Sequence, residues 1–175
     1  MALAHKKVVL RSLANTLTWG YLPPVGFLLQ NQIQLMTLDG HLSSLPANTI
    51  KRIAYVKDFN LDDPSDPERI GRMAFPSRPR GDGLWLCLTF LDNQILEGLS
   101  TFDLAFIDSI LNEQGLFLTP PDPRSNTQRL FIPRSALARV EVLGFVTAPS
   151  RRPSPPSNSS RRHPLPAAQS NLFDP

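Results

Sequence analysis

An internal repeat is the feature that most constrains the fold of this chain. Residues 7–22 (KVVLRSLANTLTWGYL) align without gaps to residues 85–100 (WLCLTFLDNQILEGLS), at an offset of 78. Residues 45–56 (LPANTIKRIAYV) align to residues 132–143 (IPRSALARVEVL), at an offset of 87. Two separate blocks that match in the same order predict two copies of one structural unit. The offsets differ by nine, so the segment between the blocks is nine residues longer in the second copy.

Each copy is predicted to be a small β-barrel. The first block reads as an alternating strand, a turn at Asn15 or Asn93, and a second strand interrupted by Gly20 or Gly98. A glycine inside a strand marks a sharp bend of the kind that curls a small sheet into a barrel. The predicted fold class is all-β, with two tandem five-stranded barrels of Sm-like or SH3-like type, in residues 1–57 and 84–146.

The alternation of side chains in the first strand predicts which of them face the core. Successive residues of a strand point to opposite faces of the sheet. Val8 and Leu10 are therefore expected to point into the first barrel, and the opposite face, formed by Lys7, Val9 and Arg11, is expected to face solvent.

Two segments are expected to lie outside the barrels. Residues 58–83 form a linker, in which Asp66 as the N-cap and Pro67 at the first helical position predict a short helix to about Ala74. Residues 147–175 are rich in Pro, Ser and Arg and lack apolar periodicity, which is typical of a disordered tail.

The second copy resembles a known family of small barrels. In residues 86–108 (LCLTFLDNQILEGLSTFDLAFID), the pair Asp92-Asn93, then Gly98, then the pair Phe102-Asp103 stand as in the first motif of Sm-like proteins, the bacterial Hfq type included. The resemblance implies a third strand after Gly98 and, as an alternative function, binding of RNA or a nucleotide. Residues 132–142 are only loosely similar to the second motif, because they lack the Arg-Gly or Lys-His pair with which that family contacts RNA.

The whole chain also resembles an uncharacterised domain of bacterial proteins. This resemblance is carried by RPRGDGLW, residues 78–85, and by TPPDPRSNTQRLFIPRSAL, residues 119–137. It implies no particular function.

The net charge of +3 belongs to the tail. From Thr147 onward the chain has four arginines and one acid, Asp174. Removing them from the totals of 18 basic and 15 acidic residues leaves 14 of each, so the body is neutral. Affinity for a nucleic-acid backbone comes largely from contacts of Lys and Arg with phosphates, and a neutral body therefore disfavours nucleic acid as the partner.

The compartment expected from the sequence is the cytoplasm. No apolar run approaches the roughly 20 residues that cross a bilayer, and no secretory signal pattern is visible. Cys87 is the single cysteine, which excludes an internal disulfide and a multi-cysteine zinc site. We predict no cofactor and no metal, since the three histidines are far apart and lack metal-binding spacing.

Two polar segments are candidate binding sites. The longer connection in the second copy concentrates hydrogen-bonding side chains that could clamp a phosphate, a carboxylate or an acidic peptide: Asp122, Arg124, Ser125, Asn126, Gln128 and Arg129. Alternatively, the same residues build a turn between two strands. The linker adds arginines that could contact an anion or form a solvated surface: Arg69, Arg72, Arg78 and Arg80.

The function predicted from these features is that of a binding or regulatory module whose partner is a protein. No phosphate-binding loop, nucleophile motif or catalytic carboxylate pair is apparent, so the prediction is that the protein is not an enzyme.

Overall fold

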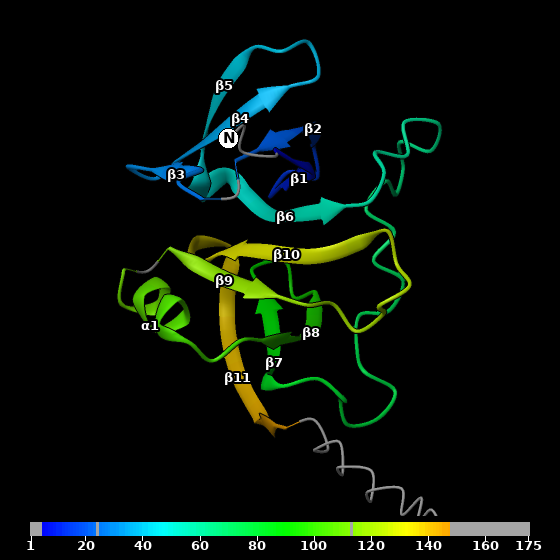
Figure 1. The fold of residues 1–175 in the computed structure, drawn as a ribbon, viewed down its shortest axis with the longest axis vertical. Coiled ribbons are helices and arrows are strands. Elements are labelled where there is room, and N and C mark those ends of the chain that lie inside the picture. The colour runs from blue at the N-terminus through cyan, green and yellow to red at the C-terminus, as the bar shows by residue number, and fades with distance from the viewer. Residues whose placement is uncertain (1–4, 24, 113, 148–175) are drawn as a thin grey trace, which may run out of the picture.

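The computed structural model describes residues 5–23, 25–112 and 114–147, which form eleven strands, one α-helix and two short 3-10 helices (Figure 1). The first half contains β1 (Lys6–Ser12), β2 (Leu17–Leu22), β3 (Leu28–Leu29), β4 (Gln32–Thr37), β5 (Leu42–Pro46), η1 (Ala47–Thr49) and β6 (Ile50–Val56). The second half contains β7 (Gly83–Phe90), β8 (Ile95–Ser100), α1 (Leu104–Leu111), β9 (Gly115–Leu118), β10 (Thr127–Pro133), η2 (Arg134–Ala136) and β11 (Leu137–Val146). The predicted predominance of strands is confirmed, and the tail prediction falls on 148–175, outside the described residues.

The strands of the two halves follow the same spatial order. In the first half the order is β6-β1-β2-β4-β5, with each neighbouring pair antiparallel. In the second half the order is β11-β7-β8-β9-β10, where β8 and β9 meet only through an isolated bridge between Leu99 and Thr119. A 3-10 helix precedes the last strand in both halves.

Residues that align in the sequence also pair in the same register. Leu10 lies opposite Ile53, and the aligned Leu88 lies opposite Val140. The turn residues Asn15 and Asn93 both adopt a left-handed backbone, with φ of 62° and 63°.

Gly20 and Gly98 occupy equivalent close approaches between strands. A Cβ atom on Gly20 would lie 2.5 Å from the carbonyl oxygen of Met36. One on Gly98 would lie 3.2 Å from that of Thr119. Glycine at these positions therefore lets β2 approach β4 closely in the first half, and lets β8 approach the end of β9 closely in the second.

The halves are joined by pairing between β6 and β10, which lie side by side at the middle of the molecule (Figure 1). Leu130 lies opposite Ala54, and Phe131 lies opposite Ile53. One eight-stranded sheet therefore runs from the first half into the second, next to a three-stranded sheet of β11, β7 and β8. The expectation of two separately closed five-stranded barrels is not confirmed.

The sheet that joins the halves has a hydrophobic core on each face. Val9, Ala54 and Leu130 belong to one core with the inner residues of the second half, and Ile53 and Phe131 belong to the other with those of the first. The prediction that Val9 faces solvent is wrong, because the second half covers that face of the strand and leaves Val9 fully buried.

The predicted linker helix is a second correction, since residues 57–82 contain no helix. Asp66 does cap a turn, as its Oδ1 accepts a hydrogen bond from the Arg69 backbone at 3.3 Å. The chain then leaves the helical path, because Arg69 has a φ of 43° and Glu68 turns into the interior, where its side chain is fully buried. Contacts with distant parts of the chain thus override the local helix signal.

The third strand implied by the Sm-like resemblance is also wrong. After Gly98 and β8, the chain forms α1 in place of a strand. Asp103 caps this helix, because its Oδ1 accepts a hydrogen bond from the backbone of Phe106 at 2.8 Å. An Asp three residues before the bonded N–H is a common N-cap arrangement, and it explains why the Phe102-Asp103 pair starts a helix here.

Candidate binding surface

The predicted loop between β9 and β10 is fastened to the linker. The side-chain amide of Asn126 donates hydrogen bonds to the backbone oxygens of Asp58 at 2.7 Å and Pro67 at 2.8 Å. Its Oδ1 accepts a hydrogen bond from the backbone N–H of Asp58 at 2.9 Å. Thr127 Oγ1 donates to the backbone oxygen of Glu68 at 2.7 Å. Much of the loop's hydrogen-bonding capacity is therefore used within the protein.

Ser125 is buried as well, and its hydroxyl donates a hydrogen bond to the backbone oxygen of Thr127 at 2.7 Å, whereas the other polar residues of this loop are more accessible. Arg124 and Gln128 are exposed, and Asp122 accepts a hydrogen bond from the backbone of Arg124 at 2.9 Å. Arg129 is exposed too, with its guanidinium carbon 4.0 Å from the centre of the Phe117 ring, a cation–π contact.

Arg129 also lines a small cavity of about 110 Å³ together with Asp103 at the start of α1. Burial raises the pKa of the neighbouring Tyr55 to about 12, although the positive charge of Arg129 opposes this shift. This phenol therefore stays neutral at physiological pH.

The linker arginines contact different parts of the molecule. Arg69 pairs with Asp63, at 3.3 Å between Nη2 and Oδ2, whereas Arg78 donates to the backbone oxygen of Phe145 in β11 at 3.1 Å. Arg72 and Arg80 are exposed. Within the part of the chain that the structure describes, no hydrogen bond or ion pair links these four arginines to the loop arginines, and the two polar segments stay predictions as binding sites.

Glu68 is the centre of an ion cluster that the sequence did not predict. Glu68 accepts hydrogen bonds from Arg52 Nε and Nη2 at 2.8 Å each, and from Arg11 Nε at 2.8 Å. Burial would raise the pKa of this carboxyl, but the hydrogen bonds and charges of Arg52 and Arg11 outweigh it and keep the pKa below its ordinary value. The cluster ties the linker to β1 and β6, so its role is structural.

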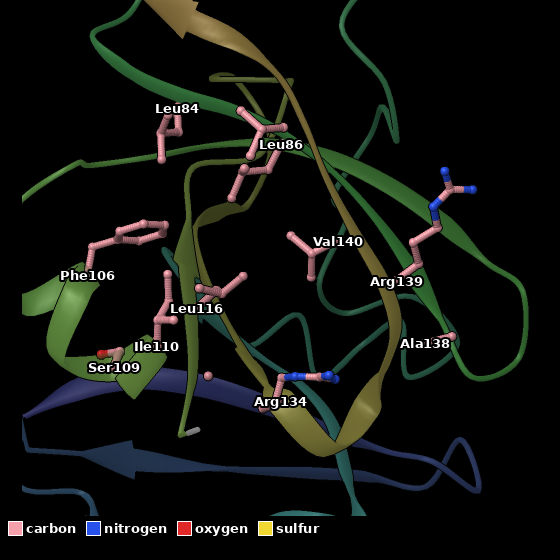
Figure 2. Close-up of a pocket in the computed structure, with 12 residues that line it drawn as sticks. Leu84, Leu86, Phe106, Ser109, Ile110, Leu116, Arg134, Ala138, Arg139 and Val140 are labelled. Carbon is pink, nitrogen blue, oxygen red and sulfur yellow. The ribbon is translucent and has the colours of Figure 1, made fainter. Parts of the chain in front are cut away.

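An apolar cavity of about 540 Å³ lies in the second half (Figure 2). It lies between α1, β9, β7 and β11. Figure 2 shows Phe106 and Ile110 reaching toward it from α1, opposite Val140 of β11, while Arg139 points away. The lining residues are Leu84, Leu86, Phe106, Ser109, Ile110, Gly115, Leu116, Arg134, Ala138, Arg139, Val140 and Val142.

Exposed apolar side chains are frequent on the helix and the strand that form this cavity. We call α1, β11 and the cavity between them the α1–β11 surface. Val142 is 63% exposed, Phe145 54% and Leu111 75%. The others are Phe102, Leu104, Ile107, Ile110, Val140 and Leu143. Concentrations of exposed apolar residues of this kind mark binding surfaces in soluble proteins. The Sm-like resemblance places the apolar residues of FDLAFID, residues 102–108, in a strand, so the sequence does not predict this surface.

The described part of the chain contains no group of three or more His, Cys, Asp or Glu residues placed to bind a metal ion. No helix within it is long and apolar enough to cross a membrane.

The fold and the cavity define a mainly β protein with an apolar concave surface. The chain belongs to a family of unknown function, DUF6982, whose model matches residues 4–144. Comparison with curated proteins and with solved structures gave no match.

Proposed function

We propose that this protein is a non-catalytic binding module that associates with another protein chain through the α1–β11 surface. The observation that carries the proposal is the cavity of about 540 Å³, because its lining consists mainly of apolar side chains. An apolar concave surface gains free energy when a partner's apolar side chains displace water from it.

A non-catalytic role is supported by the chemistry of the groups near this surface. Apart from Ser109 and two arginines, the cavity lining carries no side chain suited to acid–base or nucleophilic work. Burial raises the pKa of the Cys87 thiol, and the charges of Glu97 and Glu141 raise it further. A raised pKa disfavours the thiolate, which is the nucleophilic form of cysteine.

The proposal includes descent from a duplicated small barrel of Sm-like or SH3-like type. It is supported by the shared strand order, the matching register and the equivalent glycines of the two halves. RNA binding does not follow from this descent, since residues up to Val146 carry 14 basic and 14 acidic side chains. A cytoplasmic location is part of the same proposal.

The proposal is tested by capturing partners from a cell extract with the full chain and with two variants. Ile110→Glu places a charge on the cavity wall, at a residue that is 50% exposed and so tolerates the change in the folded state. Leu61→Glu is the matched control, because Leu61 lies in the linker and is 57% exposed. We expect the same partner to be lost from Ile110→Glu and kept by Leu61→Glu.

A salt titration of RNA binding addresses the alternative function. The full chain is compared with a chain that ends at Val146 and so lacks the basic tail. Strong, salt-sensitive binding by the shorter chain, together with capture that Ile110→Glu leaves unchanged, would contradict the proposal.

A further inference from the structure

Two of the strands at open sheet edges in the described chain are β11 and β5. Among the described residues, β11 pairs only with β7, and β5 pairs only with β4. The corresponding strands of the opposite halves, β6 and β10, pair with each other. The contact within the chain therefore uses β6 of the first half and β10 of the second. Their equivalents, β11 of the second half and β5 of the first, remain available for the same kind of contact.

We propose that β11 of one chain pairs antiparallel with β5 of a second copy, so that the β6–β10 contact is repeated between chains. This inference rests on the proposed function, because β11 belongs to the α1–β11 surface, and it names the partner as another copy of this chain.

The register of the proposed pair follows from the register within the chain. Arg129 lies opposite Tyr55 in the β6–β10 pair. At the offset of 87 residues, the equivalent pair is Leu42 of one copy and Val142 of the other. The next pair along the strands joins Ser43 to Glu141, equivalent to Leu130 and Ala54.

The side chains at these positions suit the pairing. Leu42 is 74% exposed and Val142 is 63% exposed, and the contact would bury both apolar side chains together. The hydroxyl of Ser43 can donate a hydrogen bond to the carboxylate of Glu141 across the strands.

β11 is much less buried than the equivalent strand β6, which supports the inference that β11 lacks a neighbouring strand. All residues of β6 except Tyr55 are buried, because strands pair on both of its edges and a core covers each face. In β11 only Leu137 and Val146 are buried. Sheet edges are usually protected by Lys, Pro or bulges. Pro46 ends β5, and register shifts lie on either side of residues 140–142 in β11, but no Lys or Pro occurs at the proposed contact itself, residues 140–143 of β11 and 42–44 of β5.

The position in the first half that is equivalent to the cavity is already covered by other side chains. Val140 and Val142, which line the cavity, are equivalent to Ile53 and Tyr55. There, two side chains of the second half contact β6: Phe131 of β10 lies opposite Ile53, and Phe117 of β9 lies 6.2 Å from Tyr55 between ring centres. In the assembly, β5 and its neighbour β4 from the second copy would cover the cavity instead, with Leu42 beside Val142.

The contact is head-to-tail, since different strands meet. Such contacts produce closed rings or open filaments. The full chain should therefore have a mass in solution that is a multiple of 19.5 kDa and that rises with concentration. Light scattering after size-exclusion chromatography and sedimentation equilibrium measure this directly.

Two single substitutions test the register. Leu42→Lys and Val142→Glu each place one charge against an apolar residue, and each should weaken self-association by at least about tenfold. An equal mixture of the two variants should regain the assembly, because the introduced lysine then faces the introduced glutamate. Leu61→Lys, an equally exposed change in the linker, should self-associate like the unaltered chain.

A chain that stays monomeric at every accessible concentration would overturn the inference, as would assembly that neither substitution weakens or that the mixture fails to restore. The proposed function is judged separately by the Ile110→Glu capture experiment. A monomeric chain that still loses a captured partner through Ile110→Glu would refute self-association and leave the binding module standing. Circular dichroism of each variant verifies that it remains folded.

Discussion

Glu68 is the residue at which three parts of the chain meet. It comes from the linker, and its carboxylate binds Arg11 of β1 and Arg52 of β6. Arg52 also donates a hydrogen bond at 3.2 Å to Gln94, in the turn between β7 and β8. This arrangement gives the linker a fixed path over both halves, which a locally stable helix would not require.

Replacing Glu68 should destabilise the protein strongly. Glu68→Gln removes a buried negative charge and leaves the guanidinium of Arg52, only 7% exposed, without an anionic partner. Breaking one side of a buried ion pair costs about 3 kcal/mol or more in free energy of unfolding. Urea denaturation measures this, with Asp63→Asn as the control, since that carboxylate is exposed and pairs with Arg69 at the surface. Equal losses in the two variants would contradict the assignment.

The same carboxyl should make stability depend on acid pH. Its pKa in the folded protein lies below the ordinary 4.5, so its contribution to stability is complete above that value and is lost as the pH falls through the folded-state pKa. The stability difference between the unaltered chain and Glu68→Gln should therefore shrink as the pH is lowered below 4.5. Denaturant titrations at a series of pH values measure the difference, and a gap that stays constant there would argue against this role.

At the scale of elements, the glycines of β2 and β8 control how closely the strands approach. Gly20→Ala should destabilise most, because the new Cβ would lie 2.5 Å from a backbone oxygen, which cannot move aside easily. Gly98→Ala should cost less, since its nearest contacts are 3.1–3.2 Å away. Overpacking of this kind costs about 1–3 kcal/mol in free energy of unfolding.

Gly144→Ala in β11 is the matched control for these two substitutions. Nothing lies within 4 Å of the added Cβ, and thermal or urea unfolding should be nearly unchanged. A loss at Gly144 as large as that at Gly20 would show that helix or strand propensity, and not the close approach, determines the cost.

The sequence predicted elements best where the signal was local and repeated. The alternation of Val8 and Leu10, the Asn15 and Asn93 turns and the interrupting glycines all indicated strands where strands occur. The prediction failed in the linker, because the buried partners of Glu68 are distant in sequence. It failed again at α1, because the Sm-like motif implies a strand at Phe102-Asp103, whereas Asp103 acts as the N-cap of a helix by accepting a hydrogen bond from the backbone of Phe106.

The candidate surface could not be predicted, since it depends on the arrangement of the whole molecule. The cavity forms because α1 lies across β7, β9 and β11, and no single one of these segments shows it. The β6–β10 pairing joins residues far apart in the chain, and nothing in either strand alone identifies its neighbour. The predicted polar loop is indeed rich in hydrogen-bonding side chains, but Asn126 and Thr127 use theirs to hold the linker.

At the scale of the whole molecule, the two halves should unfold as one unit. They share a sheet and a core that includes Val9 and Ala54 of the first half. The chain has one tryptophan in each half, Trp19 and Trp85. In Trp19→Phe and Trp85→Phe, the fluorescence of the remaining tryptophan should follow the same urea transition as far-UV circular dichroism. Two separated transitions would indicate independent domains.

The position of β6 between the halves has a consequence for biosynthesis. A ribosome releases β6 well before β10, so until β10 emerges one edge of β6 has backbone amides and carbonyls that no second strand pairs with. During that interval the strand could anneal to a neighbouring nascent chain on the same messenger. Slow translation between the codons for residues 57 and 127 would lengthen this exposure, whereas prompt delivery of β10 would end it.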